Sequence, residues 1–269
     1  MRLSQVIAVL EKLYPPEWAE SWDAVGLVCG DPDAEVGRVL LAVDPVAAVV
    51  DEAVRIGADL IVTHHPLLLR PVHGVAATTP KGGLIHRLIT SGVALYTAHT
   101  NADVADPGVS DALARAVGLT GPLRPLAPSP DDPARGLGRI GALEAAVPLR
   151  AFAARAAAGL PATAWGLRAA GDPDRPVRTV AVCGGAGDSL LGAARAAGVD
   201  VYLTADLRHH PASEFLEQDG PALVDAAHWA TEWPWLADLR RRLAEELDLK
   251  SHVSTLVTDT WTLHFEGEQ

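Results

Sequence analysis

The segment Gly57-Ala-Asp-Leu-Ile-Val-Thr63 decides the fold, because the chain carries a version of it twice. Its counterpart is Gly198-Val-Asp-Val-Tyr-Leu-Thr204, at an offset of 141 residues (198 − 57). Upstream, Val36-Gly-Arg-Val-Leu-Leu-Ala-Val43 matches Val177-Arg-Thr-Val-Ala-Val-Cys-Gly184 at the same offset (177 − 36). Two apolar runs at one fixed separation predict two strands joined by a helix of the same length in both halves.

The first half alternates apolar runs with helical patterns. Strands are expected at residues 39–43, 59–63 and 93–98, and helices at 46–56 and 81–90. Unalternating apolar strands separated by helices are typical of βα units in a largely parallel sheet. A third match, Ala94-Leu-Tyr96 with Ala222-Leu-Val224, extends the duplication. The sequence therefore predicts an α/β fold of two related domains, in which ligands bind outside the carboxyl ends of the strands.

A proline-rich stretch lies between the two repeats. Five prolines fall within the thirteen residues from Gly121 to Pro133. Because proline fixes φ and has no backbone N–H, this stretch is expected to form neither a helix nor a central strand. We interpret it as a linker or long loop. The expected domains are residues 1–125 and residues 126–269, with a final strand that could return to the first domain.

The composition argues against several classes of protein. The formal net charge of −12 argues against a nucleic-acid-binding surface, which needs clustered Lys and Arg. No run approaches the roughly 18 apolar residues of a membrane span, and the N-terminus lacks a signal-peptide pattern. Cys29 and Cys183 have neither disulfide-scaffold nor zinc-ligand spacing. We expect a cytoplasmic protein that binds neither nucleic acid nor membrane.

Adjacent histidines follow the second strand, in Thr63-His64-His65-Pro66. Each buried imidazole needs a polar partner, and neutral imidazole is a good ligand for divalent metals. Neighbouring side chains of an extended strand point to opposite faces, so both rings reach one metal only if the chain turns at this point. The alternatives are one metal for each ring, or two histidines with structural hydrogen bonds.

The element His-x-x-x-acid follows the third strand of each half, as His99 to Asp103 and as His228 to Glu232, at an offset of 129 (228 − 99). His228 and Glu232 share a face if they lie on a helical turn. Asp103 is predicted to be a metal ligand, the alternative being a cap for a helix near Pro107. His99 is predicted to be a general acid or base, or a partner of a ligand. Together these residues predict a carboxylate-bridged two-metal site.

Two weaker motifs remain. The segment Cys183-Gly-Gly-Ala-Gly187 follows a strand, and we interpret it as a tight turn, the alternative being an anion site built from backbone N–H groups. It lacks the lysine of a P-loop and the spacing of a dinucleotide fingerprint. His209-His210-Pro211 falls four residues later than the register of His64 requires (209 − 64 − 141). We interpret this pair as structural or as the lining of a cleft, with metal ligation as the lesser alternative.

Five ordered motifs together resemble the GTP cyclohydrolase 1 type 2 homologues, also called NIF-three-like dinuclear metal-centre proteins. They are Ser21-Trp-Asp-Ala-Val-Gly-Leu27, Thr63-His-His-Pro-Leu67, His99-Thr-Asn-Ala-Asp103, Val182-Cys-Gly-Gly-Ala-Gly187 and His228-Trp-Ala-Thr-Glu232. The resemblance implies two α/β domains in three layers, a metal cleft between them, and a homohexamer. It also implies two divalent ions per chain, as zinc, iron or manganese. The metal ligands that it implies are His64, His65, Asp103, His228 and Glu232.

The resemblance further implies a metal-dependent hydrolase. In such an enzyme a metal-activated water attacks the ring of a purine nucleotide such as GTP, or a related bond. His99 is then the catalytic acid or base. The alternative is a metal-binding scaffold or regulatory protein with vestigial activity. Ala24, Ala205 and Ala227 depart from the family pattern, and since none is a ligand, they bear on the substrate rather than on the metal.

Overall fold

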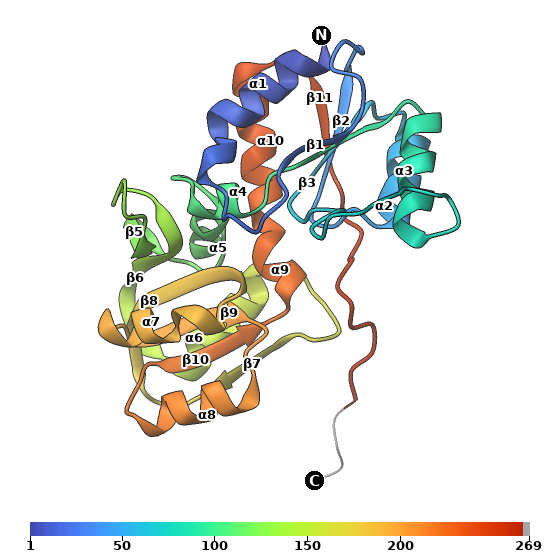
Figure 1. Ribbon diagram of the computed structural model, residues 1–269. Coiled ribbons are helices and arrows are strands. Elements are labelled where there is room, and N and C mark those ends of the chain that lie inside the picture. The colour runs from blue at the N-terminus through green and yellow to red at the C-terminus, as the bar shows by residue number, and fades with distance from the viewer. Residues whose placement is uncertain (266–269) are drawn as a thin grey trace. The chain divides into compact units, whose positions relative to one another are not determined.

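The structure of the protein is a computed structural model that describes residues 1–265 (Figure 1). Residues 266–269, the end of the expected second domain, lie outside the described residues. The chain forms two compact units, each built on its own sheet. The first unit comprises Met1–Ala105 and Leu236–Thr258, and the second comprises Asp106–Trp235 and residues 259–265. Among the described residues, no helix has the length and hydropathy needed to cross a bilayer.

The first unit has a five-stranded sheet. Its order is β1 (Gly26–Cys29), β4 (Ala94–Thr97), β3 (Leu60–Thr63), β2 (Arg38–Ala42) and β11 (Lys250–Val253). Strands β4, β3, β2 and β11 are parallel, and β1 pairs with β4 in the antiparallel direction. Strand β11, from near the C-terminus, therefore completes a sheet whose other strands come from the N-terminal part of the chain.

Helices flank this first sheet. Its helical elements are α1 (Leu3–Leu13), η1 (Pro16–Trp18), α2 (Ala47–Ile56), α3 (Pro80–Thr90), α4 (Thr100–Val104) and most of α10 (Pro234–Glu246). Residues of α2 and α3 share one hydrophobic core with β2, β3 and β4. Helices α1 and α10 lie side by side (Figure 1), where Lys12 pairs with Glu246 at 2.8 Å and Arg242 lies over the Tyr14 ring.

The second unit has a six-stranded sheet. Its order is β5 (Thr120–Pro128), β6 (Gly136–Pro148), β8 (Pro176–Ala186), β9 (Val201–Ala205), β10 (Ala222–Ala226) and β7 (Leu167–Ala170). Strands β8, β9 and β10 are parallel, and the other pairings are antiparallel. Strand β7 flanks β10 as β1 flanks β4, so the two sheets repeat one plan.

Helices cover both faces of the second sheet. One core joins the sheet to α5 (Val109–Ala116) and α6 (Leu149–Gly159), and a separate core joins it to α7 (Leu191–Ala196) and α8 (His209–Glu217). The second unit is therefore three-layered. Two short elements, η2 (Asp188–Leu190) and α9 (His228–Glu232), follow β8 and β10.

The duplication extends to individual hydrogen bonds. The Oδ2 atom of Asp59 accepts from the backbone N–H groups of Gly37 and Arg38, at the start of β2. The Oδ2 atom of Asp200, 141 residues later, accepts from Arg178 and Thr179 in β8. The preceding helices α2 and α7 are followed by Gly57 and Gly198, each with a φ of +65°. The predicted fold class of two related α/β units is confirmed.

The proline-rich stretch is where the sequence prediction was wrong. Residues 120–128 form strand β5 rather than a linker or loop. The strand lies at the edge of the second sheet and, among the described residues, pairs only with β6. Proline is tolerated in edge strands, because an N–H group on the open side has no ladder bond to lose. The strands and helices expected in the first half are confirmed within one or two residues.

Candidate metal-binding site

Three histidine rings of the first unit lie together. His64 and His65 follow β3, and His99 follows β4 as the residue before α4. The ring centroids are separated by 5.2 Å between His64 and His65, 5.1 Å between His64 and His99, and 5.6 Å between His65 and His99. One ring nitrogen from each can be chosen so that all three lie within 4.8 Å of one another, a spacing that suits a metal ion. The carboxyl ends of two neighbouring parallel strands bring these residues together.

Both adjacent histidines reach this cluster because the chain bends at His64 and His65. Their N–H groups continue the pairing with β2 by donating to the carbonyls of Ala42 and Val43. The Thr63 hydroxyl donates to the His65 carbonyl at 2.9 Å and supports the bend. The expectation that a turn allows the two rings to converge is confirmed.

The Nδ1 atom of each ring is held by an oxygen from the same unit. The partners are the Ala98 carbonyl for His64 at 3.0 Å, the Asp44 carboxylate for His65 at 2.6 Å, and the Asp23 carboxylate for His99 at 2.8 Å. Metal-ligating histidines usually show this arrangement, because the bond at one nitrogen fixes the tautomer and aims the other. Nε2 is therefore the candidate atom of each ring for binding a metal or transferring a proton.

Asp103 lies on α4, with its Oδ1 atom 3.7 Å from the Nε2 atom of His64. It is not the cap of the following helix, since α5 begins at Val109 and the carboxylate of Asp111 accepts from the Gly108 N–H at 2.8 Å. The capping alternative for Asp103 is therefore wrong. Its carboxylate is placed where it could ligate the same ion as His64.

Asp23 is a residue whose role sequence reasoning missed. Its buried carboxylate binds His99 and also accepts from the backbone N–H of Thr100 at 3.0 Å and from the Thr100 hydroxyl at 2.5 Å. Burial alone would raise the pKa of Asp23, but the bonds from His99 and Thr100 outweigh it and hold this pKa well below its usual range. The ionised carboxylate thus fixes His99. Its only signal in the sequence is its place in the Ser21–Leu27 motif.

The second unit carries a His–Glu pair on α9, as predicted. The Nε2 atom of His228 lies 3.0 Å from the Oε1 atom of Glu232, one helical turn later. The Nδ1 atom of His228 is 2.7 Å from the Oδ2 atom of Asp206. Glu232 is almost fully buried. The His228 imidazole is therefore anchored at Nδ1 by the Asp206 carboxylate and faces the Glu232 carboxylate at Nε2.

The glycine-rich segment after Val182 supports this pair. Gly185 has a φ of +68°, and a Cβ atom there would lie 2.6 Å from Glu232 Oε1 and 3.1 Å from His228 Nε2. The N–H groups of Gly184 and Gly185 donate to the hydroxyls of Ser110 and Thr231. They are already used within the protein, so the anion-site alternative is wrong. The segment is the irregular end of β8 rather than a separate turn, and it lets the His228 and Glu232 side chains lie against the backbone.

The duplication explains how the candidate residues of the two units differ. The offset of 141 places Ala205 at the position of His64 and Asp206 at the position of His65 (206 − 65). Asp206 has a φ of +56° and uses its carboxylate to hold His228. The same offset is the signal that could have identified Asp206 from the sequence.

The His209–His210 pair lies elsewhere. Both residues begin α8, their rings meet edge to face at 5.2 Å, and His209 lines a pocket described below. Neither belongs to a metal-capable group within residues 1–265. The interpretation of this pair as cleft lining is confirmed for His209.

The donor atoms fit a divalent transition metal. The first unit offers imidazole nitrogens with a nearby carboxylate, and the second offers an imidazole beside a buried glutamate. Mixed imidazole and carboxylate donors suit zinc, iron and manganese, whereas calcium and magnesium prefer oxygen ligands alone.

In the metal-free protein we expect His228 to make stability depend on pH. The charge of Glu232 raises the pKa of His228 most, burial opposes this, and the bond to Asp206 adds to it, giving a pKa of about 11. The ring titrates near pH 6.5 when the chain is unfolded. Its contribution to the free energy of unfolding is therefore complete below about pH 6.5 and is lost as the pH rises through about 11.

The measurement is urea unfolding of wild type and His228→Gln in chelator at several pH values from about 6 to about 10. The difference in free energy of unfolding between the two proteins should shrink steadily across this range. A difference that does not change with pH would contradict the protonated state of His228.

The chain matches the profile of the Duf34/NIF3 (NGG1p interacting factor 3) family over residues 1–262. A GTP cyclohydrolase 1 type 2 homolog from Streptomyces coelicolor is 60% identical over 271 residues, covering 98% of this chain and 94% of its own. A relative of the same name from Mycobacterium tuberculosis is 41% identical over 373 residues, covering 99% and 98%.

A solved structure gives the same result for the fold. A Bacillus cereus protein related to NIF3 has a TM-score of 0.89 to this chain at 26% identity, covering 98% of this chain and 99% of its own. The family profile spans nearly the whole sequence, and the motifs quoted from both units fall within it. The resemblance drawn from those motifs is confirmed, and the chain belongs to the Duf34/NIF3 family.

Proposed function

We propose that this chain is a divalent-metal-dependent hydrolase that acts on a purine nucleotide such as GTP. One support is the naming of its relatives as GTP cyclohydrolase 1 type 2 homologs. The observation that carries the proposal is the anchoring of His65, His99 and His228 at Nδ1 by carboxylates, together with that of His64 by a carbonyl. Four imidazoles whose Nδ1 atoms are held in this way have their Nε2 atoms oriented for metal binding or proton transfer.

The proposed metal ligands are His64, His65, Asp103, His228 and Glu232. We assign all five to one dinuclear centre, and this assignment rests on the sequence resemblance. When bound, the two ions would act as Lewis acids and lower the pKa of a coordinated water. Asp103 and Glu232 would supply the carboxylate ligands of this centre.

His99 is the proposed catalytic acid or base. Since the ionised Asp23 carboxylate accepts the Nδ1 proton, the Nε2 atom of the neutral ring is the one that can take up a proton and return it. Ring opening of a purine needs such a group, because a nitrogen of the base must be protonated as its bond to carbon breaks. Asp23 and Thr100 would keep the ring in place while this happens.

A test separates the catalytic role of His99 from metal binding. Hydrolysis of a panel of nucleotides and phosphoesters is measured with metal-loaded wild type and His99→Ala, with metal content determined in parallel. We expect His99→Ala to keep its metal and to lose about 100-fold or more in turnover, the usual contribution of a general acid or base.

Other results of this test favour different roles. Loss of metal in His99→Ala would make His99 a ligand. No turnover by fully loaded wild type would favour the scaffold or regulatory protein, and the hydrolase would be rejected.

We also propose a homohexamer in the cytoplasm, on the family resemblance alone. Light scattering of the purified chain tests the assembly, and a monomer at micromolar concentration would contradict it.

A further inference from the structure

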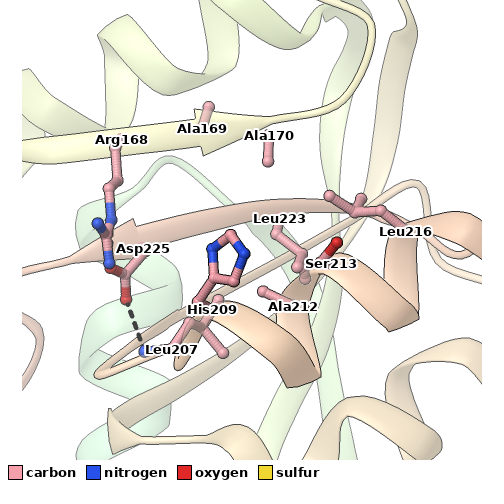
Figure 2. A pocket seen from close by; sticks show the side chains of 10 residues that line it. All are labelled: Arg168, Ala169, Ala170, Leu207, His209, Ala212, Ser213, Leu216, Leu223 and Asp225. Atoms are coloured by element: carbon pink, nitrogen blue, oxygen red, sulfur yellow. Dashed lines mark hydrogen bonds and ion pairs between the residues drawn. The ribbon is translucent and has the colours of Figure 1, made fainter.

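A pocket of about 370 Å³ lies in the second unit, apart from the ligand residues (Figure 2). Strands β7 and β10 form one wall, and one face of α8 forms the other. Its apolar lining consists of Ala169, Ala170, Leu207, Ala212, Leu216 and Leu223. The volume is at the lower end of the range for small-molecule sites, so the pocket suits a compact ligand.

A fixed guanidinium stands at one end of the pocket. Arg168 donates from Nε and Nη2 to the Oδ2 atom of Asp225, at 2.8 Å and 2.7 Å. The buried Asp225 is held in turn by the Leu207 N–H at 3.1 Å, and the guanidinium carbon lies 4.6 Å from the centre of the Trp165 ring. Two of the five N–H donors of the guanidinium are used by Asp225, and the others remain for a ligand. Because the group is already immobilised, a ligand would not have to order it.

Two further polar groups line the same pocket. The His209 ring faces the pocket beside Arg168, and the Ser213 side chain comes from the next turn of α8 (Figure 2). Within residues 1–265, neither side chain makes a hydrogen bond to another residue, and His209 has only the ring contact with His210. The guanidinium N–H groups, an imidazole N–H and a hydroxyl can all donate. This combination of donors above an apolar floor is complementary to an acceptor group on an apolar body.

We propose that this pocket binds a small organic carboxylate with a compact apolar body. The carboxylate would accept from Arg168, as guanidinium groups commonly bind this group, with His209 and Ser213 as additional donors. The apolar body would lie on the alanine and leucine lining. Asp225 is committed to Arg168 and Leu207, so its charge is already balanced.

The pocket adjoins the ligand set of its own unit through one loop. Asp206, which holds His228, directly precedes Leu207, which lines the pocket and donates to Asp225. A carboxylate bound here would therefore contact the loop that positions His228. The site does not depend on the proposed hydrolase, because the residues that line it are not metal ligands.

The test uses 4-fluorobenzoate and ligand-observed fluorine NMR with the full chain in chelator. We expect saturable binding to wild type and at least about tenfold weaker binding to Ser213→Trp, whose side chain fills the pocket. Glu214→Trp places the same ring on an exposed position of α8 outside the pocket and should bind as wild type does. The neutral 4-fluorobenzyl alcohol should bind at least about tenfold more weakly than the carboxylate.

A second variant keeps the test decisive if Ser213→Trp does not fold. Arg168→Gln combined with Asp225→Asn removes both charges of the ion pair and leaves the net charge of the pocket unchanged, and it should weaken 4-fluorobenzoate binding without changing that of the alcohol. Absence of binding to wild type, or equal binding to the wild type and Ser213→Trp, would overturn the proposal. Failure of the hydrolase assay alone would leave these results unchanged, so the two proposals are tested separately.

Discussion

Replacing both His64 and Glu232 by alanine is expected to remove the metal from the protein. Wild type purified without chelator should carry about two equivalents per chain, and the double variant close to none. Loss of a residue that only supports a ligand lowers metal affinity about 10-fold to 100-fold, so loss of two ligands should exceed this range. The measurement is elemental analysis of both proteins, before and after incubation with zinc, iron and manganese.

The matched control is His86→Ala with Glu217→Ala. It removes the same two residue types from exposed positions on α3 and α8, and should retain the wild-type metal content. Little metal in wild type, even after incubation, would mean that the histidines are structural. About one equivalent would contradict the dinuclear assignment while retaining a metal site.

The substitution Gly185→Ala, which adds a single methyl group, is expected to displace the His228 and Glu232 side chains. The Cβ atom of Gly185→Ala would lie 2.6 Å from Glu232 Oε1, which is too close, so the carboxylate or the backbone must move. His228 Nε2, at 3.1 Å from the same point, would be displaced as well. We expect metal affinity to fall about 10-fold to 100-fold, as for other losses of ligand positioning.

Gly166→Ala is the control for this variant. Gly166 has a φ of +65°, close to the +68° of Gly185, and its Cβ atom would meet nothing within 4 Å. Both variants should therefore lose about 1 kcal/mol from backbone strain, and only Gly185→Ala should lose metal affinity. Metal titration followed by calorimetry, with urea unfolding of the chelated proteins, measures both effects. Equal metal affinity in the two variants would show that Gly185 does not position the ligands.

Part of the candidate site could be predicted from the sequence because the His-x-x-x-acid element repeats with the fold. His99 and His228 follow equivalent strands, and the acid comes four residues after each. The parallel strands of both sheets could be predicted from apolar runs at a constant offset. Strands β2 and β3 of the first unit and β8 and β9 of the second consist of these runs. The prediction for the proline-rich segment was wrong because a high proline content excludes a central strand but is compatible with an edge strand.

The residues that orient the histidines could not be predicted in the same way. Asp23 reaches His99 across 76 positions of sequence, and Asp44 reaches His65 across 21. Neither pair has a local spacing that would bring it to notice, because the contact exists only once neighbouring strands have paired. The role of Gly185 was hidden for a similar reason, since a close approach of side chains from α9 to the backbone at the end of β8 leaves no periodic pattern.

The pairing of β11 with β2 sets an order of events during synthesis. The main segment of the second unit, Asp106–Trp235, is continuous in sequence and emerges from the ribosome before residues 236–258 of the first unit. Until Lys250–Val253 emerges, the outer edge of β2 has no strand beside it, and such an edge is open to pairing with other chains. The N-terminal unit, although made first, is therefore completed last. A chain that stalls before Lys250 would present this edge to neighbouring nascent chains, and so would be prone to aggregation and a substrate for chaperones.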